Sequence, residues 1–253
     1  MGLFGKSTFL DRDLEAWTLE TWAWLMRNLG GVERLCARPL VTANRAFYPP
    51  TETEGHERAL YIFDLTKRLM GLGDWPCTLE AFDRPPASVR VAQYAVIQST
   101  GAPNGTFRIE DGEVFISYAS DLAERPRELI ATLAHELAHY IICTVREPIP
   151  GGREVHELTT ELTVAFAGFG VFAANHAFEF SGYQGAGGHG WRSRHSGYFS
   201  ERTWAFALAL FTTLRSDDAG LETLKRNVAD LTKQARRYLT RNGSLVAPLM
   251  EIQ

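Results

Sequence analysis

One pentapeptide, His135-Glu-Leu-Ala-His139, constrains this chain more than any other part of its 253 residues. It lies in a run of small and apolar residues from 131 to 142, which predicts a largely buried α-helix. On a helix the two imidazoles point from one face, one turn apart, so both can bind one metal ion while Glu136 lies beside them. Buried imidazoles and a buried carboxylate need polar partners, which a metal ion supplies. The alternative is a core histidine pair that is hydrogen-bonded to the backbone.

These donor types suit a catalytic zinc ion. Such an ion usually has three protein ligands and a water molecule, whose pKa it lowers towards neutrality. A carboxylate beside that water can take its proton as the water attacks a carbonyl carbon. The sequence therefore predicts His135 and His139 as zinc ligands and Glu136 as the general base, with a third ligand elsewhere in the chain.

The identity of the third ligand separates the classes of enzyme that carry such a helix. One class continues the motif with a glycine and a third histidine, but this chain has Ile142 and Val145 at those positions. Further on, Glu157 and Glu161 stand one helical turn apart. This arrangement resembles the gluzincin group of zinc metallopeptidases, in which a second helix supplies a glutamate ligand and then an acidic residue that hydrogen-bonds a ligating histidine. The resemblance implies that Glu157 is the third zinc ligand and that Glu161 orients a histidine.

The resemblance covers residues 105–175 and departs from the family in two respects. Gluzincins usually have Asp where Glu161 stands, and their gap between the second histidine and the glutamate ligand is a residue or two longer. Two other assignments are therefore open, with Glu161 or His156 as the third ligand. We expect Glu157, because only this choice leaves an acidic residue one turn further on.

A segment rich in glycine and aromatic residues, 182–198, carries further candidates. Gluzincins commonly place a tyrosine, histidine or arginine opposite the zinc, where it donates a hydrogen bond to the oxyanion of the reaction intermediate. The resemblance implies His195 and Tyr198 for this catalytic role, with Tyr183 and His189 as alternatives. A segment of this composition is also expected to close over a site.

The periodicity of apolar residues predicts an α+β fold. Residues 11–75 have helical periodicity in two stretches, around 14–29 and 59–70. Residues 78–121 change to the alternation of β-strands, and Asp111-Gly112 predicts a hairpin turn between two of them. Pro126 suits the first turn of the histidine helix.

This order of elements is similar to the minimal gluzincin core. We therefore expect a zincin-like metallopeptidase core, with a small mixed sheet, a zinc helix and a second ligand helix, to which N- and C-terminal helices are added. Residues 1–77 would be an N-terminal helical region packed on the core, and residues 78–253 the catalytic domain. In such folds the strand before the zinc helix lies at the sheet edge and pairs with an extended peptide. The resemblance therefore implies that Val114 to Tyr118 form this substrate-binding edge strand. The alternative is that the N-terminal helices cover this strand.

Composition limits the class of protein further. A content of 45% hydrophobic and 22% charged residues fits a compact enzyme, and a net charge of −4 without a basic stripe argues against a nucleic-acid binder. Cys36, Cys77 and Cys143 have no paired spacing, so we expect no disulfide framework and a cytoplasmic location. We find no targeting signal, and the most apolar run, 162–174, is too short to span a bilayer and should form a buried helix.

The expected function is that of a zinc metallopeptidase, which hydrolyses a peptide or protein substrate with a water molecule activated by Glu136. One alternative is a catalytically silent zincin-fold protein with a binding or regulatory role, in which the histidine helix is a structural staple. Glu136 counts against it, because a structural site needs no general base. Another alternative is a metal-dependent hydrolase that acts on a non-peptide amide.

Overall fold

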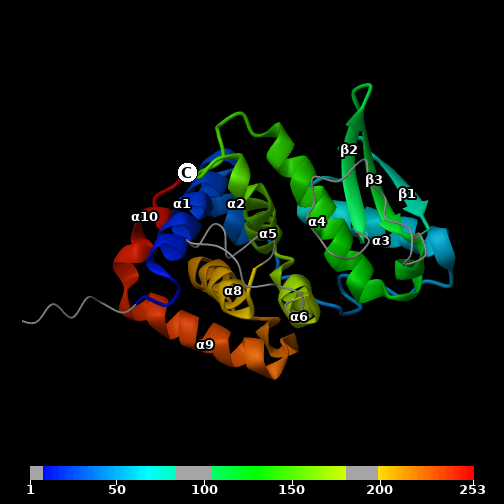
Figure 1. The fold of residues 1–253 in the computed structure, drawn as a ribbon. Coiled ribbons are helices and arrows are strands. Elements are labelled where there is room, and N and C mark those ends of the chain that lie inside the picture. The colour runs from blue at the N-terminus through cyan, green and yellow to red at the C-terminus, as the bar shows by residue number, and fades with distance from the viewer. Residues whose placement is uncertain (1–7, 84–103, 181–198) are drawn as a thin grey trace, which may run out of the picture.

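The computed structural model describes residues 8–83, 104–180 and 199–253. The α-helices are α1 (Arg12–Asn28), α2 (Gly31–Ala37), α3 (Gly55–Met70), α4 (Pro126–Thr144), α5 (His156–Phe166), α6 (Gly170–Phe180), α8 (Glu201–Arg215), α9 (Arg226–Arg241) and α10 (Ala247–Met250). The strands are β1 (Thr78–Phe82), β2 (Gly105–Glu110) and β3 (Glu113–Ala119). The sheet and α3 lie at one end of the molecule, α1, α2 and α8 to α10 lie at the other, and α4 and α5 stand between them (Figure 1). The predicted α+β class is confirmed at this level.

The sheet has the strand order β1-β3-β2, with β1 parallel and β2 antiparallel to β3. Asp111 and Gly112 connect β2 to β3, and both have positive φ values, 52° and 84°. Two successive left-handed residues form the tight turn whose twist matches that of the strands it joins. The predicted hairpin is confirmed.

The prediction that Val114 to Tyr118 forms an edge strand is wrong. β3 is the central strand, because β1 pairs with its other side in a register that sets Thr78 opposite Phe115. This pairing joins residues far apart in the chain, so the local hairpin signal could not reveal it. β2 is the strand at the sheet edge nearest α5 (Figure 1), and no strand of the described residues pairs with its outer side.

The two helices predicted in the N-terminal region are present as α1 and α3. α1 begins after Asp11, whose carboxylate caps the helix by accepting a hydrogen bond from the main-chain N–H of Asp13. The predicted helical stretches do not include α2, which begins at Gly31, two residues after the last of the first stretch. α1 packs against α5, while α3 packs against α4 and β1. The division of the chain at residue 77 stays a prediction.

The apolar run 162–174 is buried as predicted, but it is not one helix. α5 ends at Phe166 and α6 begins at Gly170, with Gly168 between them at a φ of +92°. A side chain at Gly168 would place its Cβ 2.2 Å from the main-chain oxygen of Pro39. The glycine therefore permits both the left-handed backbone and the close approach of residues 39–41. Together these features end α5.

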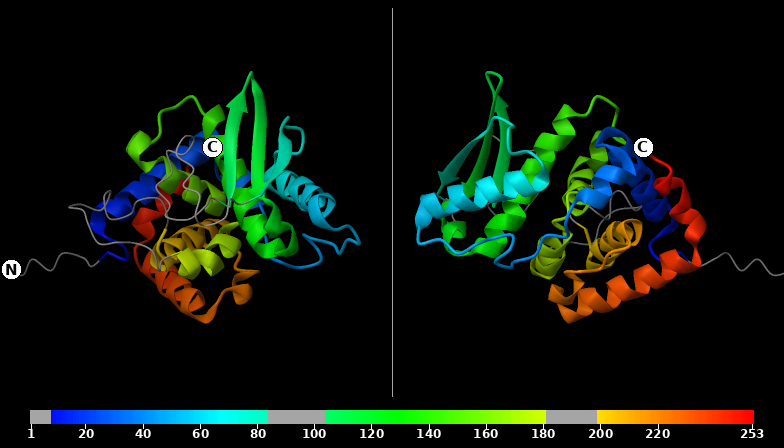
Figure 2. Two further views of the ribbon diagram at one scale, coloured as in Figure 1. Left: turned by 45° about the vertical axis from the view of Figure 1, so that its right-hand side comes forward. Right: turned by 180° about the vertical axis from the view of Figure 1, so that it is seen from behind.

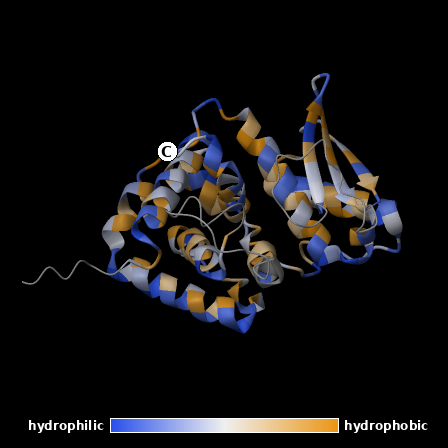
Figure 3. Cartoon of the chain, in the orientation of Figure 1, coloured by the Kyte–Doolittle hydropathy of each residue, from blue (hydrophilic) through white to orange (hydrophobic). Residues whose placement is uncertain are grey.

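The C-terminal helices close the helical end of the molecule. α8 is buried along almost its whole length, and α9 packs across it. Figure 3 shows hydrophilic and hydrophobic residues alternating along α9, and its buried positions, Val228, Thr232, Ala235 and Leu239, recur every three to four residues. Within the described residues, no helix has the length and apolar character that crossing a membrane requires. All three cysteines are free thiols.

Candidate metal centre

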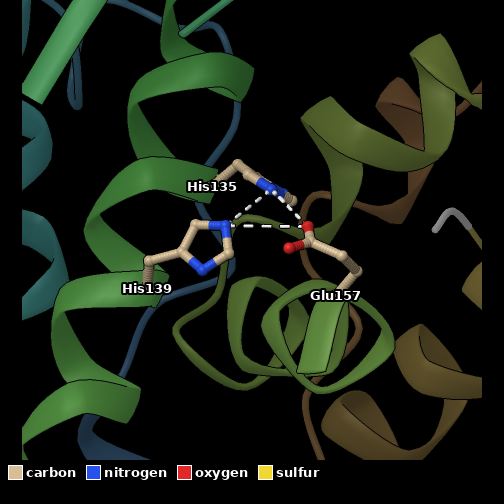
Figure 4. Close-up of side chains that lie close together, drawn as sticks. All are labelled: His135, His139 and Glu157. Carbon is tan, nitrogen blue, oxygen red and sulfur yellow. Dashed lines mark hydrogen bonds and ion pairs between the residues drawn. The ribbon is translucent and has the colours of Figure 1, made fainter. Parts of the chain in front are cut away.

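Two helices bring the candidate ligands together. α4 has Pro126 in its first turn and buries Leu133, Leu137 and Ile141, which leaves the histidine face directed towards α5. α5 follows a short 3-10 turn and packs against α4, with Glu157 in its first helical turn. The side chains of His135, His139 and Glu157 converge between the two helices (Figure 4).

The three donor atoms form a compact triangle. The Nε2 atoms of His135 and His139 are 3.2 Å apart, and Oε2 of Glu157 is 3.4 Å from the first and 3.7 Å from the second. Zinc bonds of about 2.0–2.1 Å at the tetrahedral angle separate neighbouring ligand atoms by roughly 3.3 Å. The triangle therefore has the size that three ligands of one tetrahedral zinc ion require.

Glu161 and His156, the alternative third ligands, occupy other places. Oε1 of Glu161 lies 3.3 Å from Nδ1 of His135, on the side of the ring away from the triangle. The imidazole of His156 stacks on that of His139, with ring centroids 5.1 Å apart and planes at 11°, and its Nδ1 is 3.9 Å from Oε1 of Glu157. Among the described residues, His135, His139 and Glu157 form the group that could hold a metal ion. The geometry thus favours Glu157 as the ligand and Glu161 as the partner of His135.

The side chain of Glu136 lies against β2 at Gly105. Glu136 is 7% exposed, and a Cβ added to Gly105 would lie 2.9 Å from Glu136 Oε1 and 2.6 Å from Cγ2 of Thr132. Burial raises the pKa of Glu136 to about 7, the charge of Glu157 adds to this rise, and His135 opposes it. A carboxyl group with a pKa near neutrality can both accept and return a proton, as a general base must.

The histidines carry very different proton affinities. Burial acts to lower the pKa of His135, but the carboxylates of Glu157 and Glu161 outweigh it and raise this pKa well above the ordinary value. Burial and the neighbouring charge of His135 lower the pKa of His139 to about 3. The two carboxylates therefore favour the protonated form of His135 in the metal-free site.

Two residues near the site were not foreseen from the sequence. Thr160 Oγ1 lies 3.3 Å from Nδ1 of His139, so the second histidine also has a partner on α5. Gly105 allows β2 to lie against Glu136. In the sequence, only its position one residue before Glu161 could have pointed to a role of Thr160 in the site. For Gly105, only its position at the start of a predicted strand could have done so.

The candidates for oxyanion binding lie outside the described residues. They are His195 and Tyr198, with the alternatives Tyr183 and His189, and all fall within residues 181–198. The predicted closure of residues 182–198 over the site concerns the same segment. These assignments stay predictions.

Comparison with known proteins assigns no family to this chain. No protein-family model matches it, and no curated protein or solved structure is significantly similar to it. The interpretation of the site therefore rests on its own donor atoms. Two imidazole nitrogens and one carboxylate oxygen are a donor set that suits catalytic zinc, which usually takes a water molecule as its fourth ligand.

Proposed function

We propose that this protein is a zinc metallopeptidase whose residues 105–175 form a zincin-like core of the gluzincin type. The observation that carries the proposal is the triangle of His135 Nε2, His139 Nε2 and Glu157 Oε2, with sides of 3.2, 3.4 and 3.7 Å. Glu136, buried and next in sequence to the first of these ligands, supplies the acid–base group that hydrolysis needs.

The roles of the side chains follow from their positions. When bound, zinc supplies a Lewis acid that polarises the substrate carbonyl and lowers the pKa of a coordinated water molecule. Glu136 accepts the proton of the attacking water and delivers it to the nitrogen of the leaving amine. Its pKa of about 7 suits both transfers near neutral pH.

The position of β2 supports a peptide as the substrate. β2 packs against α4, with Gly105 at Glu136 and the ring of Phe107 parallel to that of His139 at 6.1 Å. An extended peptide that paired with the outer edge of β2 would run past the general base and the metal ligands through main-chain hydrogen bonds. Such pairing recognises the peptide backbone, so it favours a peptide over a small non-peptide amide.

Digestion of a broad peptide library by the zinc-loaded protein tests this function. We expect the natural protein to cleave peptides and Glu136→Gln to retain zinc while losing activity by about 100- to 10,000-fold, because the amide cannot accept the proton. Glu128→Gln is the matched control, since Glu128 lies on the same helix but pairs with Arg125 at its start. Absence of cleavage by the zinc-loaded natural protein would favour the catalytically silent alternative, and equal activity in Glu136→Gln would remove Glu136 from the mechanism.

A further inference from the structure

Three threonines of α5 make the same kind of hydrogen bond within the helix. The hydroxyls of Thr159, Thr160 and Thr163 each donate to the main-chain oxygen four residues earlier, at 2.9, 3.0 and 2.8 Å. All three side chains are buried. A threonine hydroxyl has a single hydrogen, so each of these oxygens can take part in a further hydrogen bond only as an acceptor.

Of the three, Thr160 is the one whose oxygen also contacts a histidine in the described part of the chain. Its Oγ1 lies 3.3 Å from Nδ1 of His139. Because the hydroxyl hydrogen is directed to the main-chain oxygen of His156, the hydrogen of this contact must come from the imidazole. His139 then carries its proton on Nδ1, which leaves a lone pair on Nε2, the atom that faces Glu157.

We infer that Thr160 is a positioning residue, which sets the tautomer and the ring orientation of His139 for metal binding. The inference rests on the metal centre proposed above. It extends to both histidines the relation already seen for His135, whose Nδ1 lies 3.3 Å from Glu161. Two consecutive residues of α5 thus each hold one histidine of α4, and the same helix supplies the third ligand one turn earlier.

The two partners differ in a way that predicts different consequences. Glu161 is a carboxylate and strengthens the basicity of His135. Thr160 is neutral and only orients the ring of His139. Loss of Thr160 should therefore affect metal affinity through the tautomer of His139. Valine has the shape of threonine but cannot accept a hydrogen bond, and it would leave a buried N–H group without an acceptor unless the ring turns or changes tautomer.

Zinc affinity, measured by competition with a chromophoric chelator, tests the inference. We expect Thr160→Val to bind zinc about 10- to 100-fold more weakly than the natural protein, the usual effect of removing a partner of a ligating histidine. Thr160→Ser keeps the hydroxyl and should restore the affinity. Thr163→Val is the matched control, because it removes the same kind of hydroxyl from the same helix without touching a histidine.

A second measurement separates positioning from general destabilisation. The visible spectrum of the cobalt(II)-substituted protein reports ligand geometry, and we expect it to change in Thr160→Val but not in Thr163→Val. Equal zinc affinities and equal cobalt spectra for these two variants would overturn the role of Thr160 while leaving the metal centre intact. Failure of the natural protein to bind either metal would overturn the metal centre itself, and the inference with it.

Discussion

The two helices of the site contribute to it in different ways. α4 carries, within the five consecutive residues His135 to His139, the two histidines that we propose as metal ligands and the glutamate that we propose as general base. α5 carries the proposed third ligand, Glu157, and the partners of both histidines, Thr160 and Glu161. The chemistry of α4 follows from its local sequence, whereas the contribution of α5 depends on how that helix packs against α4.

The two helices also differ in the elements that they pack against. α4 packs against β2, β3 and α3, while α5 packs against α1 and α8. The two further views of Figure 2 show the sheet and the bundle of helices at opposite ends of the molecule, as in Figure 1. α6 packs against both α4 and α5, but their other neighbours differ, so a metal ion between α4 and α5 would join the sheet side of the molecule to the helical side.

Removal of acidic residues from α5 should give the largest effects in this comparison. Glu157→Ala deletes a ligand, so we expect zinc affinity to fall by more than about 100-fold, beyond the range for residues that only orient a ligand. Glu161→Ala removes the partner of His135 and should weaken binding by about 10- to 100-fold. Chelator competition measures both.

Glu154→Ala serves as the control for these two variants, because Glu154 is exposed and lies before the first turn of α5. Its zinc affinity should match that of the natural protein. If Glu161→Ala lost more affinity than Glu157→Ala, the ligand would be Glu161, and the assignment made from the triangle would be wrong.

The contrast between the helices also explains what the sequence could reveal. The α4 residues were identified because their chemical types and their four-residue spacing have a direct meaning on a helix. Glu157 and Glu161 were predicted from the family resemblance together with the same spacing. Thr160 could not be recognised, because a threonine that bonds back to its own helix is common and only the packing of α5 brings its oxygen to His139.

For the fold, too, the sequence predicts local features but not contacts between distant residues. Helix periodicity predicted α1, α3 and α4, and the Asp111-Gly112 pair predicted the hairpin, because each signal is local. The central position of β3 depends on pairing with β1, and the end of α5 near Gly168 depends on the neighbouring segment at Pro39. Both are contacts between distant parts of the chain, which a single sequence does not display.

Gly105→Ala tests the α4 side of the comparison and should have a smaller effect on zinc binding. The new Cβ would lie 2.6 Å from Thr132 and 2.9 Å from Glu136 Oε1, so β2 or the carboxylate must move. We expect the free energy of unfolding to fall by about 1–3 kcal/mol. A displacement of the base by about 1 Å should lower kcat/KM by about 100-fold, with zinc affinity unchanged.

Gly243→Ala is the matched substitution, since a Cβ at that position would meet no atom within 4 Å. Denaturant unfolding and peptide hydrolysis compare the two variants. If Gly105→Ala retained the activity of Gly243→Ala, close packing of β2 on Glu136 would have no part in catalysis.

Proton release on zinc binding should give the smallest effect. The carboxylates of Glu157 and Glu161 raise the pKa of His135 against the effect of burial, so we expect the metal-free protein to hold a proton there at pH 7. Zinc must displace it, and each unit of pH below this pKa should weaken zinc binding by about 10-fold. Above the pKa the affinity should no longer depend on this group.

Calorimetric titration with zinc at pH 7, in buffers of different ionisation enthalpy, counts the released protons. We expect about one per zinc ion in the natural protein and fewer in Glu161→Gln, where one of the two carboxylates that raise the pKa is lost. Identical proton release in the two proteins would show that Glu161 does not hold the proton on His135.

The most direct test of the metal centre is the zinc content of the purified chain, measured by elemental analysis beside that of the double variant His135→Ala/His139→Ala. The geometry predicts about one zinc ion per natural chain and none in the variant, because two of the three ligands come from α4. A natural chain that takes up no zinc when zinc is supplied, or a variant that holds as much as the natural chain, would contradict a metal centre between α4 and α5.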